Sequence, residues 1–215
     1  MTWHLVARPA VLLAACLVLT SCGQMPEKPV TSLSGIGSDS VVVVGRLDLD
    51  PPLRPKEQQI RAGTIDPLGV GDRMRDRGFV WFSRSADTPA EKGEILLNPR
   101  LGELFFFPVP KSMPNMVGGY IPVQFNMRMV GPRSATIDEA RIEIPGVLRY
   151  DIRPGDKAIY VGTLRLHRDE FNSVTAADVV DDYAAAAAEF KRRFGPGTAL
   201  RKALPRRQAD RAASR

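Results

Sequence analysis

The alternation of apolar and polar positions predicts a chain built mainly from short β-strands. Residues 41–49 begin with four valines and then alternate, and residues 123–129 alternate throughout, as a half-buried strand does. Turn signals such as Pro145-Gly146 and Pro154-Gly155-Asp156 separate the later runs. The other strands are predicted at 79–82, 94–97, 103–109, 140–144, 148–152 and 158–167. About eight strands with no helix between them predict an antiparallel β-sandwich over residues 41–172, with a barrel as the alternative.

One amphipathic helix, over residues 173–195, is predicted to complete the domain. Thr175 is a candidate N-cap, acidic residues follow it, and basic residues lie near the end, where they complement the helix dipole. One face carries an apolar stripe at spacings of three and four: Val179, Tyr183, Ala187, Phe190 and Phe194. We expect this stripe to pack on the sheet.

Other segments have the composition of linkers or loops. Residues 22–40 are rich in Pro, Gly and Ser and predict a flexible tether. Residues 55–62 predict a brief helix, and residues 64–77 predict a long exposed loop. Residues 196–215 are basic and short of large apolar side chains, so we expect a disordered tail.

The first 22 residues are typical of an export signal. Arg8 precedes a short apolar run, which is too short to cross a bilayer as a helix, and small residues follow it. Leu19-Thr20-Ser21-Cys22 resembles the lipobox of bacterial lipoproteins. That resemblance implies removal of residues 1–21 and lipid attachment at Cys22. An ordinary signal peptide cut elsewhere, or an uncleaved anchor, is the alternative.

The lipoprotein resemblance also bears on location and on stability. In lipoproteins of double-membraned bacteria an Asp after the lipidated Cys retains the protein at the inner membrane, so Gly23 favours the outer membrane if the source is Gram-negative. Lipid burial contributes about 0.8 kcal/mol per CH2, so several acyl chains are needed for firm anchoring. The two cysteines are Cys16 and Cys22, which leaves the exported domain without a disulfide.

A second resemblance concerns residues 144–162. A strand, Pro145-Gly146, a strand ending in Tyr150-x-Ile152, a turn and then Tyr160-x-Gly162 resemble the closing strands of transthyretin-like and carboxypeptidase-regulatory-like sandwiches. Lipoproteins of uncharacterised function carry such domains. The resemblance implies the fold and no catalytic residues.

The net charge of +6 is unevenly distributed. Residues 191–215 hold nine Lys or Arg and one Asp, and once this +8 and Arg8 are removed, residues 22–190 carry −3. Basic residues near an anionic surface each contribute about 1 kcal/mol of attraction. The tail, with Arg201, Lys202, Arg206 and Arg207, is therefore a candidate for binding phospholipid headgroups, lipopolysaccharide phosphates or peptidoglycan. The alternative is a solvated tail, and no nucleic acid is expected for an exported protein.

Candidate chemistry is sparse. His167 is the one histidine of the mature chain and has no Cys or second His with which to bind a metal, so we expect a surface residue. A Ser-His-Asp arrangement is the alternative, but no Gly-x-Ser-x-Gly elbow accompanies it. Asp178, Asp181 and Asp182 are candidates for a calcium site, but acids at the start of a helix explain them. Gly69-x-Gly71 is an incomplete dinucleotide-binding motif. Glu143 and Asp151 are candidates for an acid–base pair, but solvated strand faces explain them, so we predict no catalytic residue, metal or cofactor.

Two apolar segments are candidate contact surfaces. Residues 113–122 predict a loop in which Met113, Met116 and Tyr120 offer an adaptable surface, unless the loop folds back on its own sandwich. Phe105-Phe106-Phe107 predicts a central strand buried on both faces, with a partner groove as the alternative.

These observations favour a lipid-anchored envelope protein with a non-enzymatic role in structure or protein interaction. An envelope hydrolase or small-ligand carrier is one alternative, and tail-mediated binding to anionic polymers is another. The sequence leaves the partner and the oligomeric state open.

Overall fold

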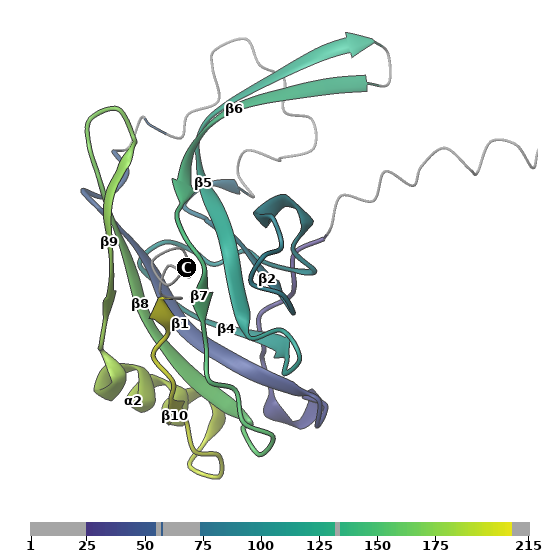
Figure 1. Ribbon diagram of the computed structural model, residues 1–215, viewed down its shortest axis with the longest axis vertical. Helices are drawn as coiled ribbons and strands as arrows, with labels where there is room; N and C mark the ends of the chain where they lie inside the picture. The colour runs from purple at the N-terminus through teal and green to yellow at the C-terminus, as the bar shows by residue number, and fades with distance from the viewer. Residues whose placement is uncertain (1–24, 55–56, 58–73, 132–133, 208–215) are drawn as a thin grey trace, which may run out of the picture.

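The computed structural model describes residues 25–54, 57, 74–131 and 134–207. Two β-sheets pack face to face, and helix α2 (Tyr183–Phe194) lies on the outer face of one of them (Figure 1). The prediction of a mainly β sandwich with one packed C-terminal helix is confirmed. The predicted helix at 55–62 and most of the loop at 64–77 lie outside the described residues.

The first sheet, sheet A, is mixed rather than purely antiparallel. It contains β1 (Ser40–Asp50), β4 (Leu104–Pro110), β8 (Ala158–Arg168), β9 (Val174–Val180) and β10 (Arg201–Lys202). β4 pairs antiparallel with β1, β1 and β10 pair parallel with β8, and β9 pairs antiparallel with β8. Parallel pairing needs a long connection, and the chain between β1 and β8 supplies one by building the other sheet.

The second sheet, sheet B, includes the longest strand. It contains β2 (Phe79–Ser83), β3 (Ile95–Leu97), β5 (Asn115–Gly131), β6 (Ser134–Ile144), β7 (Leu148–Arg149) and β11 (Arg206–Arg207). β5 pairs with β2 on one edge and with β6 and β7 on the other. The β5–β6 hairpin continues past the body of the sandwich (Figure 1).

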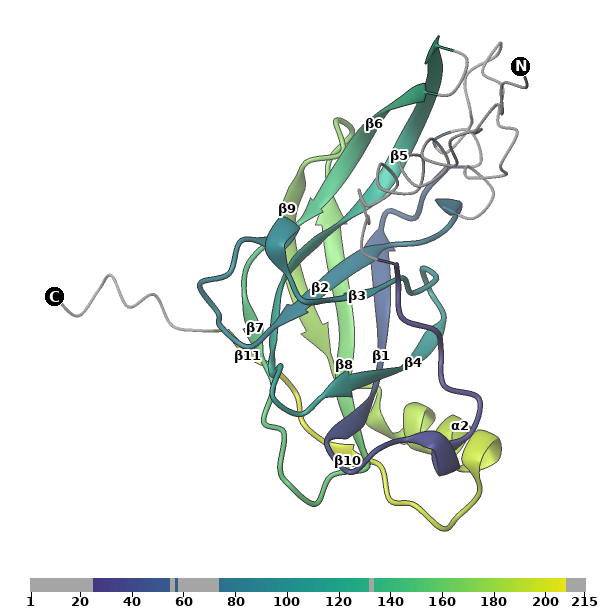
Figure 2. The ribbon, with the colours of Figure 1, turned by 90° about the vertical axis from the view of Figure 1, so that its right-hand side faces the viewer.

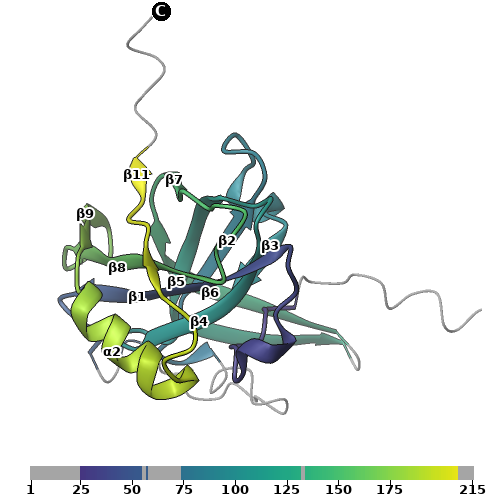
Figure 3. The ribbon, with the colours of Figure 1, turned by 90° about the horizontal axis from the view of Figure 1, so that it is seen from below.

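The alternation along β1 explains both layers of the core. Val41, Val43 and Leu47 point into the cluster between the sheets. Val42 and Val44 point outward, where Ala186 and Phe190 of α2 cover them (Figure 3). A bulge between Val44 and Arg46, next to Gly162 with φ +90°, shifts the register with β8.

The helix predicted over 173–195 was wrong in its first part. Residues 174–180 form strand β9, and the helix begins at Tyr183 after the N-cap Asp182. Val174, Thr175 and Val179 are β-branched, and pairing with the edge of β8 satisfies the main chain. The rest of the stripe behaves as expected, because Phe190 is buried and Tyr183, Ala187 and Phe194 pack beside it.

The predicted tether is packed where the structure describes it. The Glu27 amide donates to the Leu96 carbonyl (2.8 Å), and the Val30 amide donates to the Phe106 carbonyl (2.7 Å). Val30 is buried, and the segment runs down the sheet edge beside β4 (Figure 2). β4 is therefore an edge strand sealed by the N-terminal segment, and the prediction of a central strand at Phe105-Phe106-Phe107 was wrong in that respect. Phe106 and Phe107 are buried as predicted.

The tail predicted to be disordered is largely ordered. β10 pairs with β8 of sheet A and β11 pairs with β7 of sheet B, so residues 200–207 cross from one sheet to the other (Figure 3). We call residues 200–207 the strap. Leu200 and Ala203 are buried, because the strap covers the free edge of β8. Residues 208–215 lie outside the described residues.

Candidate functional site

One end of the sandwich gathers the polar features that could serve a function. We call it the upper end, since it is at the top of Figure 1. It holds the end of β1 at Asp48 and Asp50, the turn between β8 and β9, and the projecting β5–β6 hairpin.

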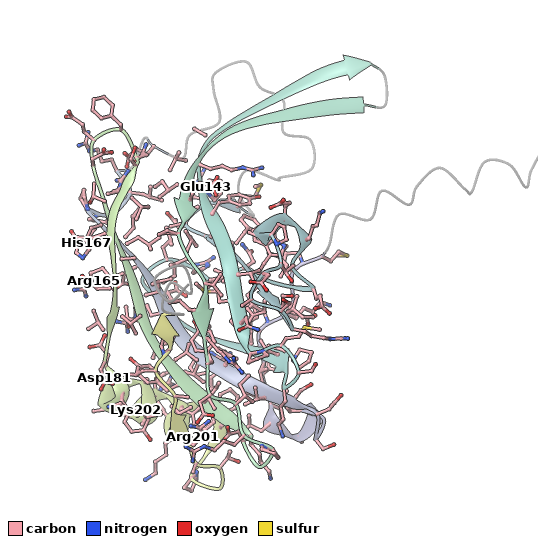
Figure 4. The ribbon with its side chains drawn as sticks, in the orientation of Figure 1. Glu143, Arg165, His167, Asp181, Arg201 and Lys202 are labelled. Atoms are coloured by element: carbon pink, nitrogen blue, oxygen red, sulfur yellow. The ribbon has the colours of Figure 1, made fainter. Side chains whose placement is uncertain are left out.

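His167 lies on the outer face of sheet A and joins three strands (Figure 4). Its Nδ1 lies 3.1 Å from Oδ2 of Asp50 on β1, and its Nε2 lies 2.9 Å from Oδ2 of Asp178 on β9. Both ring nitrogens donate at once only when the imidazole is protonated. Because each nitrogen faces its own carboxylate, the ring acts as a bridge between strands and leaves neither nitrogen for a substrate.

Polar side chains continue along the same face towards α2. Arg165 Nη2 lies 3.8 Å from Oδ2 of Asp48, and the Thr163 hydroxyl donates to Asp182 across 3.1 Å. A cross-strand pair such as Arg165–Asp48 contributes about 0.2–1 kcal/mol. With the contacts of His167, these two contacts form a ladder of polar contacts that joins β8 to β1, β9 and the start of α2.

An open cleft of about 480 Å³ lies beside this ladder. Its volume falls in the range of small-ligand sites, roughly 300–1,000 Å³. Its wall is formed by Asp48, Leu49, Asp50, Pro52, Leu53, Asp76, Leu101, Gly102 and Arg165. Three carboxylates and one guanidinium make the cleft suited to a cationic rather than an anionic group. Among the described residues, no group of three or more His, Cys, Asp or Glu could hold a metal ion.

Arg168 fixes the walls around this end, and no pattern in the sequence singles it out. Its side chain is 2% exposed and donates to the carbonyls of Pro51 and Pro52, both at 2.9 Å. It also forms two hydrogen bonds with the Glu57 carboxylate, at 2.9 and 2.8 Å, and one with Asn172. These five contacts use all five N–H groups of the guanidinium. The hydrogen bond from Arg168 is the main reason that the pKa of Glu57 is lowered.

A small cavity of about 30 Å³ lies between the sheets. It is lined mainly by apolar side chains and has room for about one water molecule. The Tyr150 hydroxyl lies 3.8 Å from the Met116 sulfur. Burial raises the pKa of Tyr150, so this phenol stays neutral.

The contact loop predicted around Met113 is part of the sandwich. Met113 and Met116 are buried in the core between the sheets, and residues from Asn115 onward form β5. These two methionines therefore do not form an adaptable surface. The segment folds back on its own sandwich, which was the alternative, with Met116 on β5 and Met113 just before it. Tyr120 is half-buried, stacks on Phe79 with ring centres 5.1 Å apart, and carries the Arg141 guanidinium 4.1 Å above its ring.

Two of the basic residues of the strap, Arg201 and Lys202, are bound to acids of the same chain. Arg201 Nε lies 2.7 Å from Asp156 Oδ1 and Nη2 lies 2.6 Å from Oδ2, a bidentate pair that lowers the pKa of Asp156. Lys202 forms an ion pair with Asp181 (Figure 4). The backbones of Arg206 and Arg207 pair with β7. The prediction of a free basic tail was thus wrong for Arg201 and Lys202.

The other candidate residues do not converge. Asp178, Asp181 and Asp182 turn to three different partners, namely His167, Lys202 and Thr163. Asp151 pairs with Arg153 and Arg201, whereas Glu143 is exposed on β6 towards the upper end (Figure 4). The lipobox with Cys22, Gly23 and the Gly69-x-Gly71 motif lie outside the described residues.

No protein-family model, no curated protein and no solved structure matches this chain. Within the described ranges, no helix is both long enough and apolar enough to cross a bilayer.

Proposed function

We propose that this chain is a lipid-anchored envelope protein that binds other proteins through its upper end and performs no chemistry of its own. The observation that carries the proposal is the β5–β6 hairpin, whose far half extends beyond the sandwich (Figure 1).

The hairpin is longer than the fold requires. β5 pairs with β2 only as far as Tyr120, whereas its pairing with β6 continues to Gly131 opposite Ser134. We call residues 124–140 the ribbon; in the structure as described, no third strand pairs with its backbone. A two-stranded ribbon is marginally stable alone in water, and its edges present main-chain groups ready to pair. Addition of a partner's strand would satisfy those groups.

The polar groups at this end support binding rather than catalysis. Both nitrogens of His167 face carboxylates, and Arg165 faces Asp48, so these groups are engaged within the sheet. A general base needs a free nitrogen or oxygen within hydrogen-bond reach of its substrate. A stable charged face beside a projecting ribbon suits recognition of a partner.

The lipobox supports the anchored location. Cys22 stands five residues before Glu27, whose amide is bonded to β3, and a fully extended chain of that length spans at most about 18 Å. A lipid on Cys22 would thus hold the β3 edge close to the membrane surface, on the other side of the molecule from the β8–β9 turn (Figures 1 and 3).

The test is in-cell cross-linking and pull-down of the full-length protein, compared with a variant, the ribbon variant, in which Asn-Gly replaces residues 124–140. Capture of a specific partner is expected to fall at least about tenfold in the variant, because the main-chain groups that would pair with the partner are removed. A tenfold loss corresponds to about 1.4 kcal/mol of binding free energy. A matched control replaces residues 85–88, a loop on sheet B, by Asn-Gly. Equal capture by the ribbon variant and the full-length protein would exclude the ribbon as the binding element.

A further inference from the structure

The turn between β8 and β9 presents an aromatic side chain to solvent. Phe171 is 80% exposed, and among the described residues only Met25, near the start of the described chain, is a large apolar residue of comparable exposure. A turn needs no aromatic residue at its tip, and a free ring gains nothing for the stability of its own fold.

The turn that carries Phe171 is held rigidly. One carboxylate oxygen of Asp169 accepts hydrogen bonds from the amides of Phe171 (2.9 Å) and Ser173 (2.8 Å). The Asp169 amide donates to the Ser173 carbonyl (3.0 Å), which closes the turn. Asn172 has φ +66°, and its side chain accepts a hydrogen bond from the buried Arg168. The backbone on both sides of the ring is therefore fixed before any partner arrives.

The surroundings of Phe171 disfavour a lipid surface. Asp169 and Glu170 directly precede it, and anionic headgroups attract basic rather than acidic segments. The turn also lies across the molecule from strand β3, to which the first part of the described chain is bonded (Figure 3). A ring flanked by carboxylates is complementary to an apolar pocket with a basic rim.

We propose that Phe171 is an aromatic anchor that inserts into an apolar pocket of a partner protein, where Lys or Arg at the rim pairs with Glu170. The inference rests on the proposed function, since it assigns the chemistry of the partner bound by the upper end. Aromatic side chains that fill central pockets dominate many interfaces, and a preformed turn avoids the ordering cost of binding.

The experiment places a photoreactive phenylalanine analogue, benzoylphenylalanine, at position 171 of the full-length protein in cells. The matched control carries the same analogue at Lys92, which is exposed on the short helix η2 (Ala90–Lys92). An adduct with one partner protein is expected at 171 and not at 92, with the linked peptide lining an apolar pocket that has Lys or Arg at its rim.

Two substitutions then test the assigned contacts by pull-down of that partner. Phe171→Ala is expected to weaken capture about 30-fold, as truncation of a central aromatic anchor does, and Phe171→Tyr to retain it. Glu170→Lys is expected to weaken capture at least about tenfold, and Glu170→Gln less, because like charges across an interface are costly. Since Phe171 and Glu170 are exposed, the thermal midpoint of each variant is expected to stay unchanged.

An adduct with lipid, with a second copy of this chain or with nothing would overturn the inference, as would capture that is insensitive to Glu170→Lys. The ribbon variant separates this inference from the proposed function. If position 171 gives no adduct while the ribbon is still required for capture, the Phe171 inference fails and the proposed function stands. If the adduct at 171 survives ribbon replacement, the role of the ribbon fails and that of Phe171 stands.

Discussion

At the scale of single residues, Arg168 connects three parts of the upper end. Its guanidinium is almost fully buried and holds Pro51, Pro52, Glu57 and Asn172 together. Removal of one partner of a buried ion pair leaves the other charge without compensation, which is more costly than the loss of an exposed pair.

We expect Arg168→Met to reduce the free energy of unfolding by about 3 kcal/mol, because the Glu57 carboxylate and two carbonyls lose their donors. Arg168→Lys keeps the charge but not the planar fork, so an intermediate loss is expected. Urea denaturation measures both. The control is Arg84→Met, which breaks the exposed Arg84–Glu94 pair and is expected to cost less than about 1 kcal/mol. Equal losses for Arg168→Met and Arg84→Met would show that the buried network does not stabilise the fold.

The Arg201–Asp156 pair predicts an acid-sensitive strap. The hydrogen bonds from Arg201 lower the pKa of Asp156 in the folded state below its usual value of 3.8. A carboxyl with a lowered folded-state pKa contributes stability above its unfolded pKa, and the contribution is lost as the pH falls through the folded value. At pH values below about 4, the urea concentration at the unfolding midpoint is therefore expected to decrease. The decrease is expected to be smaller in Asp156→Asn. Measurements from pH 2 to 6 check this, with Glu91→Gln as an exposed control; identical pH profiles for Asp156→Asn and the unmodified protein would contradict it.

At the scale of elements, both chain segments outside the predicted sandwich seal its edges. The N-terminal segment bonds to β3 and β4 through Glu27 and Val30, and the strap bonds to β8 and β7. Open sheet edges invite pairing with other chains, so such covers are a common device in β-proteins.

The strap makes a stop codon after Gly197 a structural change and not merely the loss of a tail. Burial of Leu200 alone stabilises by about 2 kcal/mol, and the strap also supplies the β10 and β11 pairings. We expect this truncation to lower the thermal midpoint by at least about 5 °C. A stop after Arg207 keeps the strap and serves as the control. An unchanged midpoint after the shorter truncation would show that the strap is dispensable.

At the scale of the whole molecule, the proposed lipid attachment at Cys22 predicts an orientation. A dye at Lys92, just before β3, is expected to lie near the bilayer, and a dye at Glu170 far from it, because only five residues separate Cys22 from Glu27. Energy transfer to headgroup-labelled lipid, measured on single-cysteine variants of the lipidated protein, is expected to be high at 92 and low at 170. Cys22→Ala is expected to abolish transfer at both positions. Similar transfer at 92 and 170 would contradict a fixed orientation.

The candidate site was less predictable than the fold. His167 and Asp178 were both visible as polar residues, but their contact and that with Asp50 arise only because β1, β8 and β9 are neighbours. Arg168 and Phe171 carry no motif, since a buried cation and an exposed ring are defined by their surroundings. Met116 and Tyr120 were misplaced because residues 113–122, which include Gly118 and Gly119, predict a loop, whereas residues from Asn115 onward form β5.

The sequence by itself determined strands β1, β2, β3, β4 and β8, the two-layer core and the apolar face of α2, because alternation with periods of 2 and 3.6 records which side of a segment is buried. The tertiary structure decided where the edges lie and what covers them. The same β-branched residues at 174–180 could extend a helix or complete a sheet, and the free edge of β8 selected the sheet. The basic residues at 201–202 became part of the fold for the same reason. Their main chain pairs with the edge of β8, and their side chains form ion pairs with Asp156 and Asp181.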